Sequence, residues 1–473
     1  MRMFVAGEWI TGTQEEELRA PYSGEVIDTV PLASVDDVDR AIAAAVRGAE
    51  HQRRATGYER EAILRRAGDI ADEQVDALAR IISSESGKPI AEATAEASRA
   101  GHILRLSGFE GSQLYGDSLP LDAAPNAGLS RLGFTMRQPC GVVVAITPFN
   151  FPLLLVLHKI APALAAGNAV VLKPARQTPL TALKLTEILL EAGLHPEAIS
   201  CVTGAGGVLG DALCADPRVR KVSFTGSTAI GERITEVAGV KMLSLELGAS
   251  CPVVILPDAD LELAARAIAV GGYANAGQVC ISVQRVVADR AVVGDFLDAL
   301  VPKVEAIKVG DPSEQDTGLA SLISEHEAIR VETAIRDGSH NGARLLTGGE
   351  RDGAVLTPAV VADVDPDSPL SQEELFGPAV AVSAVPDVDA AIAAANATSF
   401  GLGAGIFTGE VTNAVRFARE VEAGNIHINW TPLWRADLMP YGGLKGSGIG
   451  KEGPRYAVED MTELKTVVLH GAT

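Results

Sequence analysis

The sequence predicts an α/β protein with parallel β-sheets, divided into two or three domains. Its 473 residues exceed what one ordinary hydrophobic core holds. Apolar residues make up 47% of the chain, which is enough material for large buried cores. Between residues 141 and 246, and again from 252 to about 429, short β-branched segments alternate with helical ones. That alternation is typical of parallel strands joined by right-handed crossovers.

The composition restricts the partners and the location of the protein. The chain has 40 Lys and Arg against 61 Asp and Glu, a net charge of −21, which argues against non-specific binding of nucleic acid or an anionic membrane surface. Its five cysteines do not resemble a disulfide framework, and no metal site is expected. The first ten residues lack the pattern of a signal peptide. We therefore expect a cytoplasmic protein.

The N-terminal part is predicted to be mainly helical after a short hairpin at residues 6–8. Residues 34–49 begin with a serine, a favoured helix N-cap, and place their branched apolar residues on one face. Helical periodicity continues over residues 59–83 until the Ser-Gly-Lys-Pro segment at 86–89 ends it. A second helix is expected to run through residues 102–106.

Residues 114–137 differ from this pattern. Prolines, Asn126 and Gly128 separate short apolar pieces there, which predicts a hairpin. Composition leaves open whether this hairpin is a surface loop or a projecting arm. Near the C-terminus, residues 464–469 are β-branched enough to form a strand.

The first alternating region supplies the elements of a parallel sheet. Helices are expected over residues 153–166 and over 178–192, where Gly193 ends the second one. The strands are expected at residues 141–146, 169–172, 199–202, 221–224 and 243–246.

Cys280 lies near the centre of the small-residue stretch 271–285. A cysteine in such surroundings is usually buried and inert. However, its Gly-Gln-Val-Cys sequence resembles the nucleophile motif of the NAD(P)-dependent aldehyde dehydrogenase superfamily. Further motifs of that family follow in the same order over nearly the whole chain. The resemblance is closest to the lactaldehyde, glyceraldehyde and phosphonoacetaldehyde dehydrogenase branch.

The resemblance implies oxidation of an aldehyde to its carboxylic acid. The Cys280 thiolate would attack the aldehyde, and the Asn150 amide in the segment 147–152 would bind the oxyanion with the Cys280 N–H. Glu246 would activate the water that hydrolyses the thioester. Ala249 stands where the family usually has a second glycine, and its effect is not predicted.

The same motifs imply a nicotinamide cofactor, NADP or NAD. The strand–turn–helix segment 224–231 offers a close backbone approach and a helix N-terminus to a pyrophosphate. The implied cofactor-binding residues are Thr147, Phe149, Lys173, Arg176, Gly206, Gly210, Phe224, Gly226, Ser227, Leu247, Glu374 and Phe376.

Arg176 departs from the family pattern in a way that bears on cofactor choice. A glutamate is usual at this position in NAD-preferring members, where it binds the ribose hydroxyls and repels a 2′-phosphate. A guanidinium suits a phosphate instead, so we predict that NADP is accepted and preferred. The alternative is that Arg176 points to solvent or pairs with an acidic neighbour such as Glu187.

Three positively charged or imidazole side chains suggest a small polar or anionic aldehyde. Arg105, His158 and Arg435 occur in or near segments that line the aldehyde tunnel in the family. Arginine could grip the acidic end of such a substrate. The alternative is that Arg105 and Arg435 pair with surface carboxylates.

Two other functions remain open at this point. A CoA-acylating enzyme would pass the thioester to CoA, but such members lack the glutamate found here at 246. A catalytically silent binding or structural protein on the same scaffold is the other alternative.

The family architecture implies an oligomer, a homodimer or a homotetramer, joined through an arm made of the hairpin and the final strand. The implied parts are a cofactor-binding domain at 1–113 and 138–246, a catalytic domain at 247–443, an oligomerisation arm at 114–137 and 456–473, and a return segment at 444–455.

Overall fold

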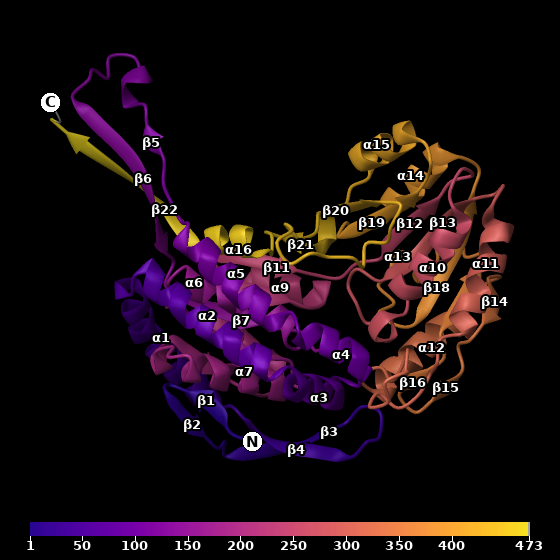
Figure 1. The fold of residues 1–473 in the computed structure, drawn as a ribbon, viewed down its shortest axis with the longest axis horizontal. Helices are drawn as coiled ribbons and strands as arrows, with labels where there is room; N and C mark the ends of the chain where they lie inside the picture. The colour runs from indigo at the N-terminus through magenta and orange to yellow at the C-terminus, as the bar shows by residue number, and fades with distance from the viewer. Residues whose placement is uncertain (472–473) are drawn as a thin grey trace.

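A computed structural model describes residues 1–471 of the chain. Its strands form an eight-stranded and a seven-stranded sheet together with three small ones. The two large sheets and their helices form two bodies, and a narrow arm projects away from the first body (Figure 1). This mixed α/β architecture with parallel sheets confirms the predicted fold class.

The eight-stranded sheet has five parallel strands at its centre, as predicted from the alternation. Antiparallel strands close its edges, and the strand order is β2-β1-β9-β8-β7-β10-β11-β21. The central strands are β7 (Val142–Ile146), β8 (Ala169–Lys173), β9 (Ile199–Cys201), β10 (Val219–Thr225) and β11 (Met242–Glu246), and the edges are β1 (Met3–Val5), β2 (Glu8–Ile10) and β21 (Gly448–Ile449).

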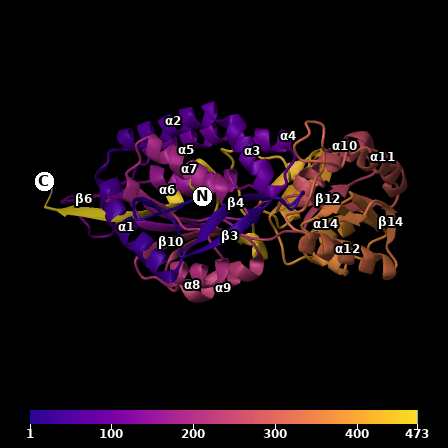
Figure 2. The same cartoon turned by 90° about the horizontal axis from the view of Figure 1, so that it is seen from below.

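Helices cover both faces of this sheet. Seen from below, α2, α5, α6 and α7 lie on one side of it and α8 and α9 on the other (Figure 2). Apolar side chains of strands and helices form one continuous core between them. The crossover helices and the short η2 turn are α6 (Leu154–Ala165), α7 (Leu180–Glu191), η2 (Pro196–Ala198), α8 (Gly206–Ala215) and α9 (Thr228–Ala238).

The N-terminal helices are more divided than predicted. The periodicity over 59–83 belongs to two helices, because Gln74 leaves helical backbone angles at φ −110° and ψ 16°. A hairpin of β3 (Gln14–Arg19) and β4 (Val26–Leu32) was not predicted, since the glutamate-rich β3 has low β propensity. The helices are α1 (Val35–Arg54), α2 (Gly57–Glu73), α3 (Val75–Ser86), α4 (Ile90–Ala97) and α5 (Ala100–Ser112).

The second alternating region forms the seven-stranded sheet, in the order β14-β17-β18-β13-β12-β19-β20. Only β14 at its edge is antiparallel. Its strands are β12 (Cys251–Ile255), β13 (Val283–Asp289), β14 (Arg344–Thr347), β17 (Ala359–Ala362), β18 (Ala379–Val385), β19 (Gly403–Phe407) and β20 (Asn425–Ile428). The accompanying elements are α10 (Leu261–Gly271), η3 (Ala274–Gly277), α11 (Val293–Glu305), α12 (Glu325–His340), β15 (Arg351–Asp352), β16 (Val355–Leu356), α13 (Pro369–Gln372), α14 (Val388–Asn396) and α15 (Val411–Glu420).

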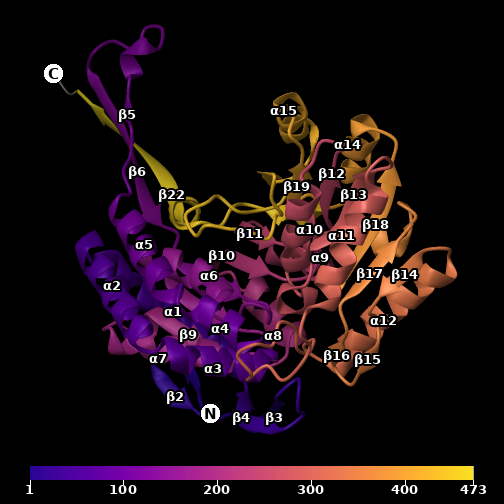
Figure 3. The ribbon, with the colours of Figure 1, turned by 45° about the vertical axis from the view of Figure 1, so that its right-hand side comes forward.

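The arm is a three-stranded sheet in which the C-terminal strand is paired along its whole length. β22 (Thr462–His470) runs antiparallel to β6 (Arg131–Pro139), from Thr462 opposite Pro139 to His470 opposite Arg131. The arm stands clear of both bodies (Figure 3). The predicted strand at 464–469 lies within β22, while residues 472–473 of the expected arm lie outside the described residues. The remaining elements are β5 (Ser118–Leu119), η1 (Leu121–Ala123), η4 (Lys445–Ser447) and α16 (Pro454–Asp460).

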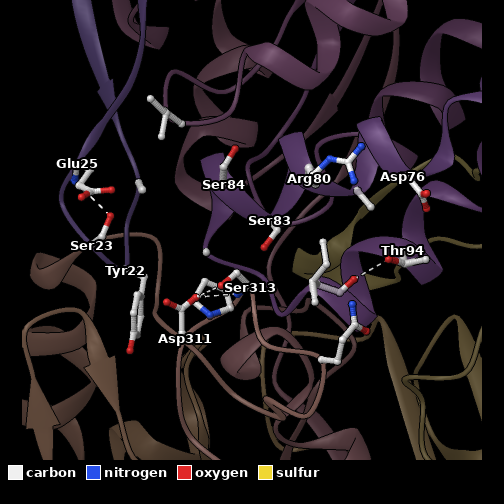
Figure 4. Close-up of a pocket in the computed structure, with 17 residues that line it drawn as sticks. Tyr22, Ser23, Glu25, Asp76, Arg80, Ser83, Ser84, Thr94, Asp311 and Ser313 are labelled. Carbon is white, nitrogen blue, oxygen red and sulfur yellow. Dashed lines mark hydrogen bonds between the residues drawn. The ribbon is translucent and has the colours of Figure 1, made fainter.

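A cavity of about 630 Å³ is lined by residues other than the predicted catalytic ones. Tyr22 in the turn of the β3–β4 hairpin, Arg80 on α3 and Asp311 in a loop of the second body line it (Figure 4). Cys280 is not among its lining residues. Within residues 1–471, no helix is both long and apolar enough to span a membrane.

Candidate active site

Cys280 lies in the loop that leads from η3 into β13. Asn275 and Ala276 have left-handed backbone angles, with φ 50° and 54°, and Gly277 follows at φ 72°. A Cβ on Gly277 would lie 2.1 Å from the carbonyl oxygen of Gly377, so only glycine fits there. These turns lead the chain from η3 toward β13 and leave Cys280 half-buried.

The Cys280 thiol touches the hydroxyl of Tyr441, with 2.9 Å between Sγ and Oη. The pKa of Cys280 is raised to about 12, mainly by burial, and the carboxyl groups of Glu374 and Glu246 contribute to the rise. The hydrogen bond with Tyr441 and the charge of Arg435 oppose this rise. The thiol is therefore protonated at neutral pH in these surroundings.

Asn150 follows β7 and is tied to the loop of Cys280. Its Nδ2 donates to the Gln278 carbonyl oxygen at 2.7 Å, and its own carbonyl oxygen accepts from Asn275 Nδ2 at 3.1 Å. Among the described residues, its Oδ1 has no partner. The structure thus joins two segments that are 130 residues apart in the sequence, as the predicted role of Asn150 requires.

Helix α4 supports both of these segments, a feature that the sequence analysis missed. Glu92 accepts a hydrogen bond from the Asn275 backbone N–H at 2.9 Å. One turn later, Glu96 accepts from the N–H groups of Leu153 and Leu154, at 3.0 and 3.1 Å, and pairs with the buried Lys88. The four-residue spacing of the two glutamates is the signal that could have placed them on one helix face.

Glu246 ends β11 and is buried without a partner for its Oε2 among the described residues. Burial raises the pKa of Glu246 well above its usual range, and the neighbouring carboxylate of Glu452 raises it further. A Cβ on Gly442 would lie 2.7 Å from Glu246 Oε1, so the glycine leaves the carboxyl group room. A buried carboxyl group with a raised pKa takes up a proton more readily than an exposed one.

Arg435 contacts both Glu452, which neighbours Glu246, and Tyr441, which touches Cys280. Its guanidinium lies over the Tyr441 ring, 3.9 Å from the centroid, and its Nη1 is 3.2 Å from Glu452 Oε2. Lys159 Nζ donates to the other oxygen of Glu452 at 3.0 Å. Burial would raise the pKa of Glu452, but Lys159 and Arg435 lower it to about 2. Within residues 1–471, Arg435 Nε and Nη2 have no partner.

His158 lies beside this cluster, together with Asp437 and Arg99, which were not among the predicted site residues. Its Nε2 is 3.8 Å from Asp437 Oδ1, and Arg99 from the start of α5 pairs with the same aspartate. Burial lowers the pKa of His158 to about 3, and the charge of Arg435 lowers it as well. His158 is therefore neutral, and its Nδ1 has no partner among the described residues.

Arg105 does not join the cluster. It pairs with Asp69 at 3.1 Å and with Asp72 at 2.6 Å, both on α2, and its side chain is 38% exposed. This corrects the expectation that it contacts substrate, because its position on α5 directs it to α2 instead. The surface pairing named as the alternative describes Arg105 but not Arg435, whose partner Glu452 is buried.

Arg176 is paired with Glu16 of β3, with 2.7 Å between Nε and Oε2. Glu187, the neighbour considered in the sequence analysis, instead pairs with Lys184. Lys173 is buried at the end of β8 and donates to the Pro174 carbonyl oxygen at 3.1 Å. Burial lowers the pKa of Lys173 to about 8.

Two helix N-termini lie open for an anionic group, because neither has a side-chain cap within residues 1–471. Helix α8 begins at Gly206, and a Cβ there or on Gly210 would meet nothing within 4 Å. Helix α9 begins after Ser227, and a Cβ on the preceding Gly226 would lie 2.5 Å from the Phe224 ring. The free N–H groups of such helix ends suit a pyrophosphate.

The other predicted cofactor residues come from both large sheets. Leu247 packs closely on α9, where a Cβ on Gly231 would lie 2.4 Å from it. Glu374 accepts from the Ala249 N–H at 3.0 Å, and burial raises the pKa of Glu374 to about 7. The Phe149 and Phe376 rings meet edge to face with centroids 5.9 Å apart, and the Thr147 hydroxyl has no partner among the described residues.

His51, His195 and Glu197 form a separate group whose ligand-type atoms lie within 4.8 Å of one another. The Glu197 carboxylate accepts two hydrogen bonds from Arg47. His195 Nδ1 accepts from the Glu197 N–H at 3.2 Å. These contacts engage Glu197 and one nitrogen of His195, and the cluster contains none of the predicted site residues.

A thiol, an amide and a carboxyl group are thus held near the facing ends of two parallel sheets, an arrangement suited to an oxidoreductase that acts through a sulfur nucleophile. The sequence pattern of the aldehyde dehydrogenase family matches residues 9–467. The chain belongs to the aldehyde dehydrogenase family.

Similar proteins cover nearly the full length of the chain. A 3-sulfolactaldehyde dehydrogenase of Priestia aryabhattai is 40% identical over 99% of this chain and 98% of that protein. A lactaldehyde dehydrogenase of Methanococcus vannielii is 36% identical over 99% of this chain and 100% of its own. The crystal structure of an NADP-dependent glyceraldehyde-3-phosphate dehydrogenase from Bacillus halodurans, complexed with NADP, is 35% identical, has a TM-score of 0.97 and aligns over 100% of this chain and 99% of that one.

Proposed function

We propose that this aldehyde dehydrogenase oxidises a small anionic aldehyde to its acid with NADP or NAD, through a thioester on Cys280. The observation that carries the proposal is the joining of Cys280, Asn150 and Glu246 in one buried region. Cys280 attacks the aldehyde carbon as a thiolate, which gives a thiohemiacetal alkoxide. When bound, the nicotinamide accepts the hydride that leaves this carbon.

Asn150 is suited to stabilise the alkoxide. Its amide has two N–H bonds, and the Gln278 carbonyl takes one of them. The second is available to an oxyanion on Cys280, together with the Cys280 N–H. Each such preorganised donor typically lowers the barrier by about 3–4 kcal/mol.

Glu246 is the group proposed to activate water against the thioester. Its unpartnered Oε2 can take a proton, and the raised pKa of Glu246 brings its titration toward the working pH. The charges of Lys159 and Arg435 moderate that rise, so the carboxylate form remains accessible. Hydrolysis then releases the free acid and returns Cys280 to its thiol.

The substrate proposal rests on the free N–H groups of Arg435. Arg99 and Lys159 pair with Asp437 and Glu452, and Arg435 uses only its Nη1 toward Glu452. The unpaired Nε and Nη2 of Arg435 can bind the oxygens of a sulfonate, phosphate or carboxylate. The Priestia relative is named for 3-sulfolactaldehyde and the Bacillus structure for glyceraldehyde-3-phosphate, which are both anionic aldehydes.

The cofactor proposal rests on the two open helix N-termini and the groups near them. The ends of α8 and α9 would hold the pyrophosphate, and Glu374 the nicotinamide ribose. Lys173 would reach the adenosine ribose, and Arg176 would bind a 2′-phosphate in exchange for Glu16. NADP is named for the Bacillus structure and for a Methanocaldococcus jannaschii glyceraldehyde-3-phosphate dehydrogenase, and NAD for a Sinorhizobium meliloti aldehyde dehydrogenase.

Cofactor binding and the nucleophile are assigned to different large sheets. We propose that residues 1–113 and 138–246 bind the cofactor and that 247–443 carry the nucleophile. The arm of β5, β6 and β22 exposes Leu132, Phe134, Met136, Leu464 and Leu469, an apolar surface suited to a second subunit. A homodimer or homotetramer is therefore expected, and light scattering that finds a stable monomer at micromolar concentration would contradict it.

A matched pair of substrates tests the proposed function. The purified protein is incubated with NADP⁺ or NAD⁺ and with phosphonoacetaldehyde or neutral propanal, without CoA. The proposal requires reduced cofactor and free acid, with higher kcat/KM for the anionic aldehyde. Strict dependence on CoA would indicate the acylating reaction instead, and absence of turnover with any aldehyde would indicate a silent family member.

A further inference from the structure

The environment of the Cys280 sulfur is unfavourable to a thiolate except on one side. The carboxyl groups of Glu246 and Glu374, from two different elements, disfavour negative charge on it. Cys251 on β12 donates its S–H to the Cys280 carbonyl oxygen at 3.5 Å, not to the sulfur. The Tyr441 hydroxyl, 2.9 Å from Sγ, and the Arg435 charge are the groups that favour a thiolate.

The direction of the Tyr441 hydrogen bond follows from simple valence. A thiolate has no proton, so once Cys280 is ionised the hydroxyl must be the donor. Burial and the neighbouring sulfur raise the pKa of Tyr441 well above its usual range, so the phenol keeps its proton. Charge-assisted hydrogen bonds of this kind are the strong ones.

Arg435 strengthens the same donor. Its guanidinium lies 3.9 Å from the centroid of the Tyr441 ring, within the range of a cation–π contact. A cation on the ring face draws electron density from the phenol and makes its O–H a better donor. Both side chains are largely buried, so solvent screens the contact little.

We propose that Tyr441 is a further catalytic residue, whose hydroxyl donates to the Cys280 thiolate and so activates the nucleophile, with Arg435 on its ring as the polarising group. The inference rests on the proposed role of Cys280. Tyr441 lies in the Pro-Tyr-Gly-Gly sequence at 440–443, which resembles a family motif with Phe or Tyr at this position, and the proposal gives the tyrosine hydroxyl a function. Arg435 would then serve both the substrate anion and the nucleophile.

Alkylation of Cys280 by iodoacetamide as a function of pH tests this without any aldehyde. The proton of the thiol goes to solvent, and peptide mass mapping separates Cys280 from the four buried cysteines. Tyr441→Phe keeps the ring but removes the donor. We expect alkylation at neutral pH to slow by about ten- to a hundredfold and the pH midpoint to move upward by about one to two units.

A matched control removes another buried tyrosine hydroxyl. Tyr273→Phe deletes a donor to the Ala359 carbonyl at 2.8 Å and should lower Tm without moving the Cys280 midpoint. Arg435→Met gives a second test of the pair and should also move the midpoint upward. NADP affinity, measured by fluorescence, should be unchanged in Tyr441→Phe.

Each outcome is informative. A wild-type midpoint in both Tyr441→Phe and Arg435→Met, or a downward shift in Tyr441→Phe, would overturn the role of Tyr441. If iodoacetamide neither modifies wild-type Cys280 nor stops aldehyde oxidation, the proposed nucleophile itself is wrong. A shift in Tyr441→Phe equal to that in Tyr273→Phe would indicate general loosening of the structure.

Discussion

The carboxylate of Glu92 on α4 accepts a hydrogen bond from the backbone N–H of Asn275, five residues before Cys280, at a distance of 2.9 Å. Asn275 has a left-handed backbone, and its side chain in turn donates to the Asn150 carbonyl oxygen. One side chain from the N-terminal helices thus fixes the turn from which both the nucleophile and its oxyanion donor are positioned.

Glu92 is therefore expected to matter for catalysis through position. Glu92→Ala leaves the Asn275 N–H without its partner, at a cost of about 1–3 kcal/mol in the free energy of unfolding, and should lower kcat about tenfold or more. Glu92→Gln keeps an acceptor oxygen and should retain most of the activity. Steady-state kinetics and thermal unfolding check this. Equal losses in the two variants would show that the charge matters rather than the hydrogen bond.

Glu246→Gln should separate the two halves of the reaction. Since the amide cannot take a proton from water, the variant should show a pre-steady-state burst of reduced cofactor followed by slow turnover. Because the pKa of Glu246 is raised, wild-type kcat should rise as pH increases through that pKa. The variant should lose this dependence of kcat on pH. Cys280→Ser is the control, with cofactor binding but no burst. A full steady-state rate in Glu246→Gln would remove Glu246 from the mechanism.

His158 makes stability depend on pH in a defined direction. Its pKa falls from 6.5 to about 3 in the folded protein because it is buried. The unfolded chain therefore binds the proton more readily. The contribution of neutral His158 to the free energy of unfolding is present above pH 6.5 and is lost as pH falls toward 3. The expected loss is about 1.4 kcal/mol per pH unit in this window. Urea unfolding at several pH values should show a shallower slope in His158→Gln, and an unchanged slope would contradict the prediction.

The chemistry of the candidate site was largely predictable from contiguous motifs, whereas its long-range partners were not. Asn150 and Cys280 each lie in a short contiguous segment that resembles a family motif, and this resemblance is the reason for proposing them. The contacts of Glu92 and Arg99 depend on how α4 and α5 pack, which periodicity does not specify. Arg105 was misplaced for this reason, because a helical pattern shows that a face is polar but not what it meets.

The fold shows the same difference between local elements, which were largely predicted, and long-range pairings, which were not. Most parallel strands of both large sheets are buried, mainly apolar segments of three to seven residues, which contain their own signal. The β3–β4 hairpin was missed because three consecutive glutamates in β3 resemble a polar loop. The pairing of β6 with β22 joins residues more than 300 positions apart and could be expected only from the family resemblance.

Cofactor preference should respond to Glu16 as well as to Arg176. The two side chains form an exposed ion pair, so a 2′-phosphate has to displace Glu16 before it can bind the guanidinium. Glu16→Gln removes this competitor and should raise kcat/KM for NADP several-fold relative to NAD. Arg176→Glu should have the opposite effect. An NAD preference that neither variant changes would show that Arg176 does not contact the adenosine ribose.

Substrate recognition by Arg435 can be separated from a general effect of charge. Arg435→Ala removes a largely buried guanidinium with two unpaired N–H groups, whereas Arg105→Ala removes one that is already paired with Asp69 and Asp72. Loss of a bidentate, charge-assisted contact typically costs about 2–3 kcal/mol, so kcat/KM for phosphonoacetaldehyde should fall about 30- to 150-fold in Arg435→Ala.

Arg435 also touches Tyr441, so its removal should lower the rate with neutral propanal as well, but by less. The ratio of the two kcat/KM values isolates recognition of the anion, because the effect on Cys280 is common to both substrates. We expect this ratio to change at least tenfold in Arg435→Ala and to stay at the wild-type value in Arg105→Ala. An equal fall for both aldehydes in Arg435→Ala would assign Arg435 to the nucleophile alone and leave the substrate anion to Arg99 and His158.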